Sequence, residues 1–337
     1  MKSKIFFQSG FWDGINTNST VEGIRTMLNV SDALSNSFVV TDVSEELIKK
    51  DPFLMVMIRQ GKYDRCNEKY IDKKIETLNS SEDLEDLSAT YLLDKKPVVC
   101  EKIEKKYGVI AVSSESIIKK EYLFKGDGFC LDKHHCYTLR YMTYKDKLRQ
   151  PCNSLIIIDP YLLLDREVDS NTNSVRFPGI SNNLESLLDA ILPQELDVEF
   201  HLTIISSLIK GQEDVKRAYE QVKKCFKRIR KSLTIKLGFF YTAKGYNPKK
   251  ETFHSRHILA NSFMVDSEDG LDLFGDKGYV TKNNPTVSIV FPWLLGNNRQ
   301  DMTKYENWLR SVKKHVEESP DSLFYGTKEN RLFELLD

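Results

Sequence analysis

Residues 154–161 read Ser-Leu-Ile-Ile-Ile-Asp-Pro-Tyr, an apolar run that ends at Asp159 and is followed by a turn-forming proline. A short continuous apolar run bounded by such residues is typical of a buried strand. The segment before it, 144–153, is polar and contains a proline, as linkers between domains commonly do. We therefore expect two units, an N-terminal one over residues 1–148 and a C-terminal one over residues 149–337.

After this strand, apolar runs alternate with segments whose apolar residues recur at helical spacing. Further strands are expected at 198–205, 233–241, 258–265 and 286–291, and helices at 182–192, 211–231 and 302–318. This alternation predicts an α/β fold with a mostly parallel sheet covered by helices on both faces. In such sheets, ligands gather at the carboxyl ends of the strands.

The N-terminal unit is expected to be a smaller α/β domain of unknown role. Short β-like runs occur at 37–41, 97–99 and 107–112, and helical patterns occur at 43–50 and 100–106. No motif in this part of the chain indicates a particular chemistry.

The composition predicts a protein without a membrane span. The 337 residues are 40% hydrophobic, and no apolar run approaches the ~18 residues that cross a bilayer. The first residues contain only a short apolar run, at 5–7, which is too short for the core of a signal peptide. The six cysteines are too sparse for a disulfide framework. We therefore expect a cytoplasmic protein with reduced thiols.

Positive charge is concentrated in one segment. Lys plus Arg equals Asp plus Glu at 49 each, but residues 209–256 hold 14 basic and four acidic residues. A polarised charge distribution of this kind favours an anionic ligand near the basic segment. The candidate basic surface lies on the helix predicted at 211–231 and comprises Lys216, Lys223, Lys224, Lys227 and Arg228. The aromatic run at 239–241 is expected to pack in the core rather than stack on bases.

Neither a metal nor a cofactor is expected. Cys130, His134, His135, Cys136 and Cys152 form a loose cluster, but their spacing differs from the paired ligands of structural zinc sites. The sequence also contains no Gly-rich phosphate loop and no H-E-x-x-H motif.

The candidate ligand-binding motif is H-x-R-x4-N, formed by His254, Arg256 and Asn261. On a strand, His254 and Arg256 would share one face. An imidazole can donate to or attack a phosphate, and a guanidinium can hold two of its oxygens. Asp159 is a further candidate at the end of its strand, although it could simply form the turn before proline. Asp272, in the turn Gly-Leu-Asp-Leu-Phe at 270–274, is more easily explained by a role in shaping the loop.

Over about residues 150–295, these motifs resemble the phospholipase D-like superfamily. Its pattern is H-x-K-x4-D, with a histidine nucleophile and a lysine that holds the phosphate, and this chain has Arg256 and Asn261 at the last two positions. Those departures are usual in the branch found at the C-terminus of MIT (microtubule interacting and trafficking) proteins and in bacterial relatives. The chain is similar to that branch in its Asp-Pro-Tyr strand end, its His-x-Arg strand and its Gly-Leu-Asp-x-Phe turn.

The resemblance implies a phospholipase D-like module that binds a phosphate-bearing ligand, either a nucleic acid or a phospholipid headgroup. An amide at Asn261 balances an imidazolium less well than a carboxylate, so we expect weak catalysis or none. A phosphohistidine mechanism needs two histidines, and the chain has one copy of the motif. One alternative is therefore a homodimeric, metal-independent phosphodiesterase or nuclease with His254 from each subunit. A further alternative is a protein interaction module, in which His254 could be structural. The bacterial relatives suggest a role in a defence or conflict system.

Overall fold

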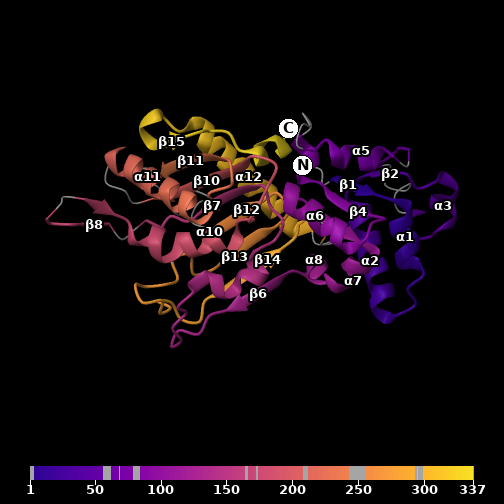
Figure 1. The fold of residues 1–337 in the computed structure, drawn as a ribbon, viewed down its shortest axis with the longest axis horizontal. Coiled ribbons are helices and arrows are strands. Elements are labelled where there is room, and N and C mark those ends of the chain that lie inside the picture. The colour runs from indigo at the N-terminus through magenta and orange to yellow at the C-terminus, as the bar shows by residue number, and fades with distance from the viewer. Residues whose placement is uncertain are drawn as a thin grey trace.

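Two large β-sheets, each flanked by helices, lie side by side along the length of the molecule (Figure 1). The structure is a computed structural model, and it describes residues 4–55, 62–67, 69–78, 84–163, 166–171, 174–207, 212–242, 256–292, 294 and 299–336. No helix in these ranges combines the length and the apolar character needed to cross a membrane.

The N-terminal sheet has five parallel strands in the order β3-β2-β1-β4-β5. Its strands are β1 (Lys4–Phe7), β2 (Phe38–Thr41), β3 (Tyr63–Arg65), β4 (Thr90–Leu93) and β5 (Ile110–Ser113). The helices of this unit are α1 (Ser9–Asn16), α2 (Val21–Asn36), α3 (Glu45–Lys50), α5 (Tyr70–Glu76), α6 (Pro97–Tyr107), α7 (Ser114–Lys119) and α8 (Tyr122–Lys125), with a 3-10 turn η1 (Leu84–Ser88).

Alternation along β1 explains why helices cover both faces of this sheet. Phe7 packs against Phe11 and Trp12 of α1, with ring centroids 6.0 and 6.1 Å apart. Phe6 points to the opposite face and stacks on Tyr91 at 4.8 Å, in the core that α5 and α6 cover. Successive residues of a strand face opposite sides, so one short strand contributes to both cores. The predicted α/β character of the N-terminal unit is confirmed.

The C-terminal sheet has eight strands in the order β15-β11-β10-β7-β12-β13-β14-β6. Strands β7 (Ser154–Ile158), β10 (Phe200–Ser207) and β11 (Ile235–Thr242) are parallel to one another. The other strands, β12 (His257–Ala260), β13 (Met264–Ser267), β14 (Thr286–Val290), β6 (Asp127–Cys130) and β15 (Phe324–Gly326), pair antiparallel. The predicted α/β class is confirmed, but the expectation of a mostly parallel sheet is wrong for this unit, because only β7, β10 and β11 pair in parallel and the sheet as a whole is mixed.

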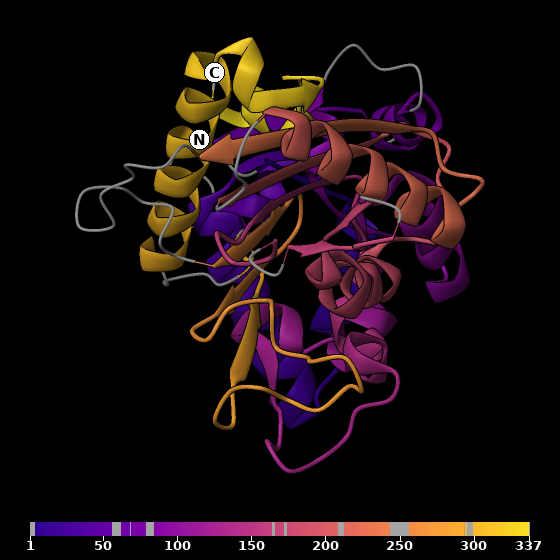
Figure 2. The ribbon, with the colours of Figure 1, turned by 90° about the vertical axis from the view of Figure 1, so that its left-hand side faces the viewer.

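Helices cover both faces of the C-terminal sheet, as expected (Figure 2). Helices α10 (Glu185–Ile191) and α11 (Gln212–Ile229) bury their apolar residues against one face, and α12 (Arg299–Glu318) covers the other. The remaining elements are η2 (Arg140–Tyr144), α9 (Lys145–Leu148), the π-helical turn η3 (Ile180–Leu184), the hairpin β8 (Glu167–Val168) with β9 (Val175–Arg176), and the 3-10 turns η5 (Asp321–Leu323) and η6 (Arg331–Leu336).

Three details differ from the sequence-based expectations. The run at 97–99 is the first turn of α6, because proline at the start of a helix gives up only an N–H that would lack a helical partner. The single strand expected at 258–265 is the hairpin β12–β13, which turns at residues 261–263. Strand β6 pairs with β14, so the stretch 127–148, which the sequence placed in the N-terminal unit, contributes to the C-terminal sheet and its core.

Candidate phosphate-binding sites

The predicted His-x-Arg and Gly-Leu-Asp motifs both have residues next to Asp159, at the carboxyl end of β7. Strand β12 runs antiparallel to β7 with His257 opposite Ile158, which places Arg256 beside Asp159 at the carboxyl end of β7. One Asp159 oxygen accepts a hydrogen bond from the backbone N–H of Leu271 at 2.7 Å. Arg256 donates from a terminal nitrogen to the carbonyl oxygen of Glu268 at 2.9 Å. The structure therefore brings together Asp159, Arg256 and the loop that carries Asp272.

Arg256 is held by contacts on several sides. Its guanidinium lies over the ring of Tyr161, 4.6 Å from the centroid, which is a cation–π geometry. Its Nε is buried without a hydrogen-bond partner among the described residues. The side chain is half-buried, so only part of the guanidinium is available to a ligand.

Gly270 allows this loop to approach Arg256. Its φ of +101° is a conformation that residues with a Cβ rarely adopt. A Cβ there would lie 2.6 Å from Oδ1 of Asp272 and 3.1 Å from Cδ of Arg256. The hydroxyl of Tyr141 donates to the carbonyl of Leu271 at 2.9 Å and holds the next residue of the loop. The Gly-Leu-Asp segment is therefore shaped to fit against Arg256.

The charges of this cluster largely balance within it. Burial and the negative charge of Asp272 together raise the pKa of Asp159 to about 6, against the opposing effect of its backbone hydrogen bonds and of Arg256. Asp272 also lies 3.8 Å from Nζ of Lys282. Since two carboxylates surround a single guanidinium, a phosphate at Arg256 would have to compete with them.

The other two residues of the motif do not add a described contact to this cluster. His254 lies outside the described residues. Asn261 lies at the opposite end of β12, fully buried between the two sheets. Its Nδ2 donates to the carbonyl of Gly108 at 2.8 Å, and its Oδ1 accepts from the N–H of Asn153 at 2.9 Å. The amide therefore joins the N-terminal unit to β7, and the structure does not bring it to the predicted ligand.

His257 is a buried histidine that the motif analysis overlooked. Its ring stacks on Trp308 of α12 with centroids 3.4 Å apart, and its Nδ1 lies 3.1 Å from Oδ1 of Asp266. Burial lowers its pKa, so the neutral form is favoured. It faces α12, whereas Arg256, one residue earlier, faces the other side. The two-residue period of a strand could have separated these roles from sequence.

The basic residues predicted on α11 are all at least partly accessible to solvent. Lys216, Lys224, Lys227 and Arg228 are exposed, and Lys223 is half-buried with Nζ 5.6 Å from the ring centroid of Tyr219. Within the described chain, Arg228 pairs with Glu185, while no ion pair involves the four lysines. The aromatic run at 239–241 is buried, which confirms its predicted place in the core.

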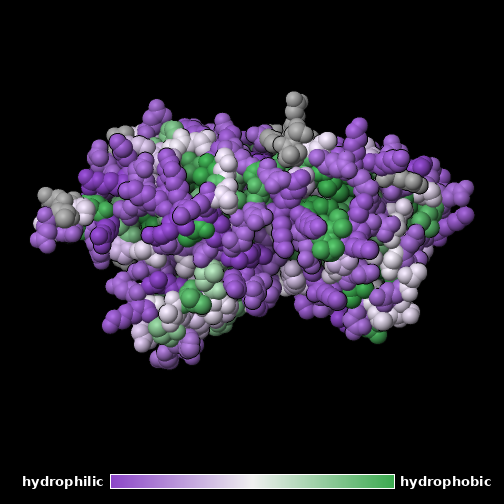
Figure 3. Space-filling model, in the orientation of Figure 1, coloured by the Kyte–Doolittle hydropathy of each residue, from purple (hydrophilic) through white to green (hydrophobic). Residues whose placement is uncertain are grey.

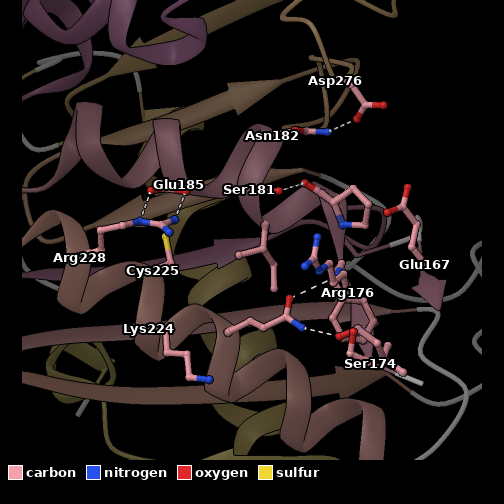
Figure 4. Close-up of a pocket in the computed structure, with 15 residues that line it drawn as sticks. Glu167, Ser174, Arg176, Ser181, Asn182, Glu185, Lys224, Cys225, Arg228 and Asp276 are labelled. Atoms are coloured by element: carbon pink, nitrogen blue, oxygen red, sulfur yellow. Dashed lines mark hydrogen bonds and ion pairs between the residues drawn. The ribbon is translucent and has the colours of Figure 1, made fainter. Parts of the chain in front are cut away.

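A cavity of about 710 Å³ lies beside α11, between this helix, the β8–β9 hairpin and the π-helical turn (Figure 4). Lys224, Arg228 and Cys225 line it from α11, and Arg176 lines it from β9. Burial raises the pKa of the Cys225 thiol to about 12, so this sulfur stays protonated at neutral pH. No sequence motif indicates the contribution of Arg176, because the hairpin and α11 are brought together only by the fold.

The N-terminal sheet also has a strand order that places ligands between β1 and β4 in other doubly wound sheets. Here the start of α1 is already occupied by carboxylates. The N–H of Ser9 donates to Asp42 at 2.6 Å, and the side chain of Asp94 lies against Gly10. Because these negative charges take the positive end of the helix, the crevice does not suit an anion.

Comparison with known proteins gives no match to a protein-family model and no match to a curated protein.

Proposed function

We propose that this chain is a phospholipase D-like module that binds a nucleic acid strand along the basic face of α11. The observation that carries the proposal is the set of exposed lysines on α11 that form no ion pair within the described chain. From Lys216 to Arg228 the helix rises about 18 Å, a length that spans several phosphates of a strand.

A nucleic acid suits this face better than a phospholipid surface does. Helices that lie on membranes combine basic residues with exposed apolar ones that insert between the lipids. Among the described side chains of α11, no large apolar one is exposed. The surface over α11 and the hairpin is mostly hydrophilic (Figure 3). These features favour a partner that is bound through its charge.

Recognition would depend on the phosphate backbone rather than on the bases. The nearby aromatic side chains Phe239, Phe240 and Tyr241 are buried and offer no platform for base stacking. Contacts between lysines and phosphates carry no sequence information and weaken with salt. We therefore expect binding that tolerates changes of sequence and is sensitive to salt.

The test is binding of a fluorescently labelled single-stranded oligonucleotide, measured by anisotropy at low salt. Replacing Lys223, Lys224, Lys227 and Arg228 with Ala should weaken binding by about tenfold or more. The matched control replaces four exposed lysines of the N-terminal unit, Lys73, Lys102, Lys105 and Lys119, and should bind as the wild type does. An equal loss of affinity in both variants would show that the effect comes from overall charge, and it would refute a site on α11.

The catalytic alternative is tested with the same reagents. A homodimeric phosphodiesterase would cleave the labelled strand without added metal, and replacing His254 with Ala would abolish the cleavage. Retention of an intact strand by the wild type supports the binding module, whereas cleavage that depends on His254 would replace it with the enzyme.

A further inference from the structure

We propose that the cavity beside α11 binds a single nucleotide unit of the strand, with its phosphate between Lys224 and Arg176. This inference rests on the proposed function and names the part of the ligand that enters the fold. The cavity, at about 710 Å³, falls within the range of sites for small molecules, roughly 300–1,000 Å³. Lys224 belongs both to the basic face of α11 and to the lining of the cavity, so a strand on the helix reaches it directly.

The two cations that would hold the phosphate come from facing elements. Lys224 belongs to α11 and Arg176 to β9, and both line the cavity, in which they are labelled in Figure 4. Neither forms an ion pair with another described residue. Arg228 differs, because its guanidinium makes two hydrogen bonds to the carboxylate of Glu185 (Figure 4). We therefore assign phosphate binding to Lys224 and Arg176. Arg228 instead joins α11 to α10 through its bonds to Glu185.

The two walls are fastened to each other without a ligand. The side-chain amide of Gln221, on α11, donates to the carbonyl of Val175 at 2.9 Å. Its oxygen accepts from the N–H of Phe177 at 3.3 Å. These bonds hold β9 against α11, so the fold sets the spacing of the two backbone segments that carry Lys224 and Arg176. A preformed site loses less entropy when a ligand binds.

The rest of the cavity offers hydrogen-bond acceptors. The carboxylates of Glu167 and Asp276 line it. Asp276 is positioned by Asn182, which donates to its Oδ1 at 2.8 Å, and by Arg140, which donates to its backbone carbonyl at 2.7 Å. Carboxylates repel a phosphate but accept bonds from sugar hydroxyls and base amino groups. The cavity therefore suits a ligand with an anionic group and several donors, as a nucleotide has.

An apolar wall completes the fit. Val175, Phe177, Pro178 and Ile180 line the cavity alongside the charged residues. This surface can receive the face of a base or the apolar side of a sugar, which inorganic phosphate does not offer. Binding energy should therefore come from both ends of the nucleotide.

The experiment is calorimetric titration of the full chain with adenosine 5′-monophosphate, adenosine and inorganic phosphate. The nucleotide should bind about tenfold or more tightly than either fragment. Arg176→Gln should weaken nucleotide binding by a similar factor, because the variant removes one of the two cations. Arg65→Gln, an exposed arginine on β3 that lies outside both the cavity and the basic face of α11, is the matched control and should leave nucleotide affinity unchanged. Circular dichroism checks that both variants fold.

Strand binding separates failure of this inference from failure of the proposed function. If the labelled strand binds but the nucleotide does not, the cavity is not a nucleotide site, and the proposal that α11 binds the strand is unaffected. Equal affinity for the nucleotide and for inorganic phosphate would also overturn the inference. If neither strand nor nucleotide binds, both proposals fail.

Discussion

The carboxylate of Asp159 accepts a 2.7 Å hydrogen bond from the backbone N–H of Leu271, joining the end of β7 to a loop more than a hundred residues later in the chain. The other oxygen of Asp159 accepts from the N–H of Tyr161 at 2.8 Å. Arg256 lies beside this junction, against Tyr161 and the same loop. The buried carboxylate of Asp159 thus connects the end of β7 to the loop at 270–274, next to Arg256.

The pH dependence of stability should report the buried state of Asp159. Because burial raises the pKa of Asp159 from 3.8 to about 6, the folded chain keeps this proton over a range where the unfolded chain loses it. The contribution of Asp159 to stability therefore falls as pH rises from about 4 to 6. The advantage of the wild type over Asp159→Asn should shrink by about 1–3 kcal/mol across this range. Urea unfolding at pH 4.5 and 7 measures it, and two parallel pH profiles would contradict the assignment.

Gly270→Ala should destabilise the protein. The substitution places a Cβ on a residue at φ +101° and within 2.6 Å of the Asp272 carboxylate. We expect a loss of about 1–3 kcal/mol in the free energy of unfolding. Gly275→Ala is the control, because the nearest atom to its added Cβ is 3.5 Å away and its φ is not positive. Equal unfolding midpoints for the two variants would show that the loop is not constrained at Gly270.

Asn261→Ala should lower stability without changing strand affinity. The substitution leaves the buried N–H of Asn153 without this partner, and it leaves the carbonyl of Gly108 with only the longer bond from the side chain of Asn153, at 3.4 Å. Losing these bonds should cost about 2–4 kcal/mol in the free energy of unfolding. Chemical denaturation and oligonucleotide anisotropy, measured on the same preparation below the unfolding transition, separate the two effects. Weaker strand binding by fully folded Asn261→Ala would show that Asn261 takes part in ligand binding after all.

Much of the C-terminal fold was predictable because its signals are local. The run at 155–158 and the apolar stripe of α11 indicated their elements directly, and the structure places both close to the expected bounds. The hairpin β12–β13 was missed because both of its strands are apolar, and only the turn at Asn261 separates them. The pairing of β6 with β14 was missed because it joins segments about 160 residues apart.

The site was predicted only in part for the same reason. The order of the motifs anticipated that Asp159 and Arg256 would meet, since neighbouring strand ends share an edge. The spacing of H-x-R-x4-N gave no sign that Asn261 would be buried at the far end of a four-residue strand. The cavity beside α11 depends on Arg176, which reaches it only through the packing of the hairpin on that helix.

The most direct test of the account is the salt dependence of strand binding. The logarithm of the affinity of the wild type for a single-stranded oligonucleotide should fall linearly with the logarithm of salt concentration, by about 0.7 per phosphate contact. In the Ala variant of Lys223, Lys224, Lys227 and Arg228, that slope should be shallower by about 2 to 3. A slope that is the same in wild type and variant would show that α11 does not carry the phosphate contacts.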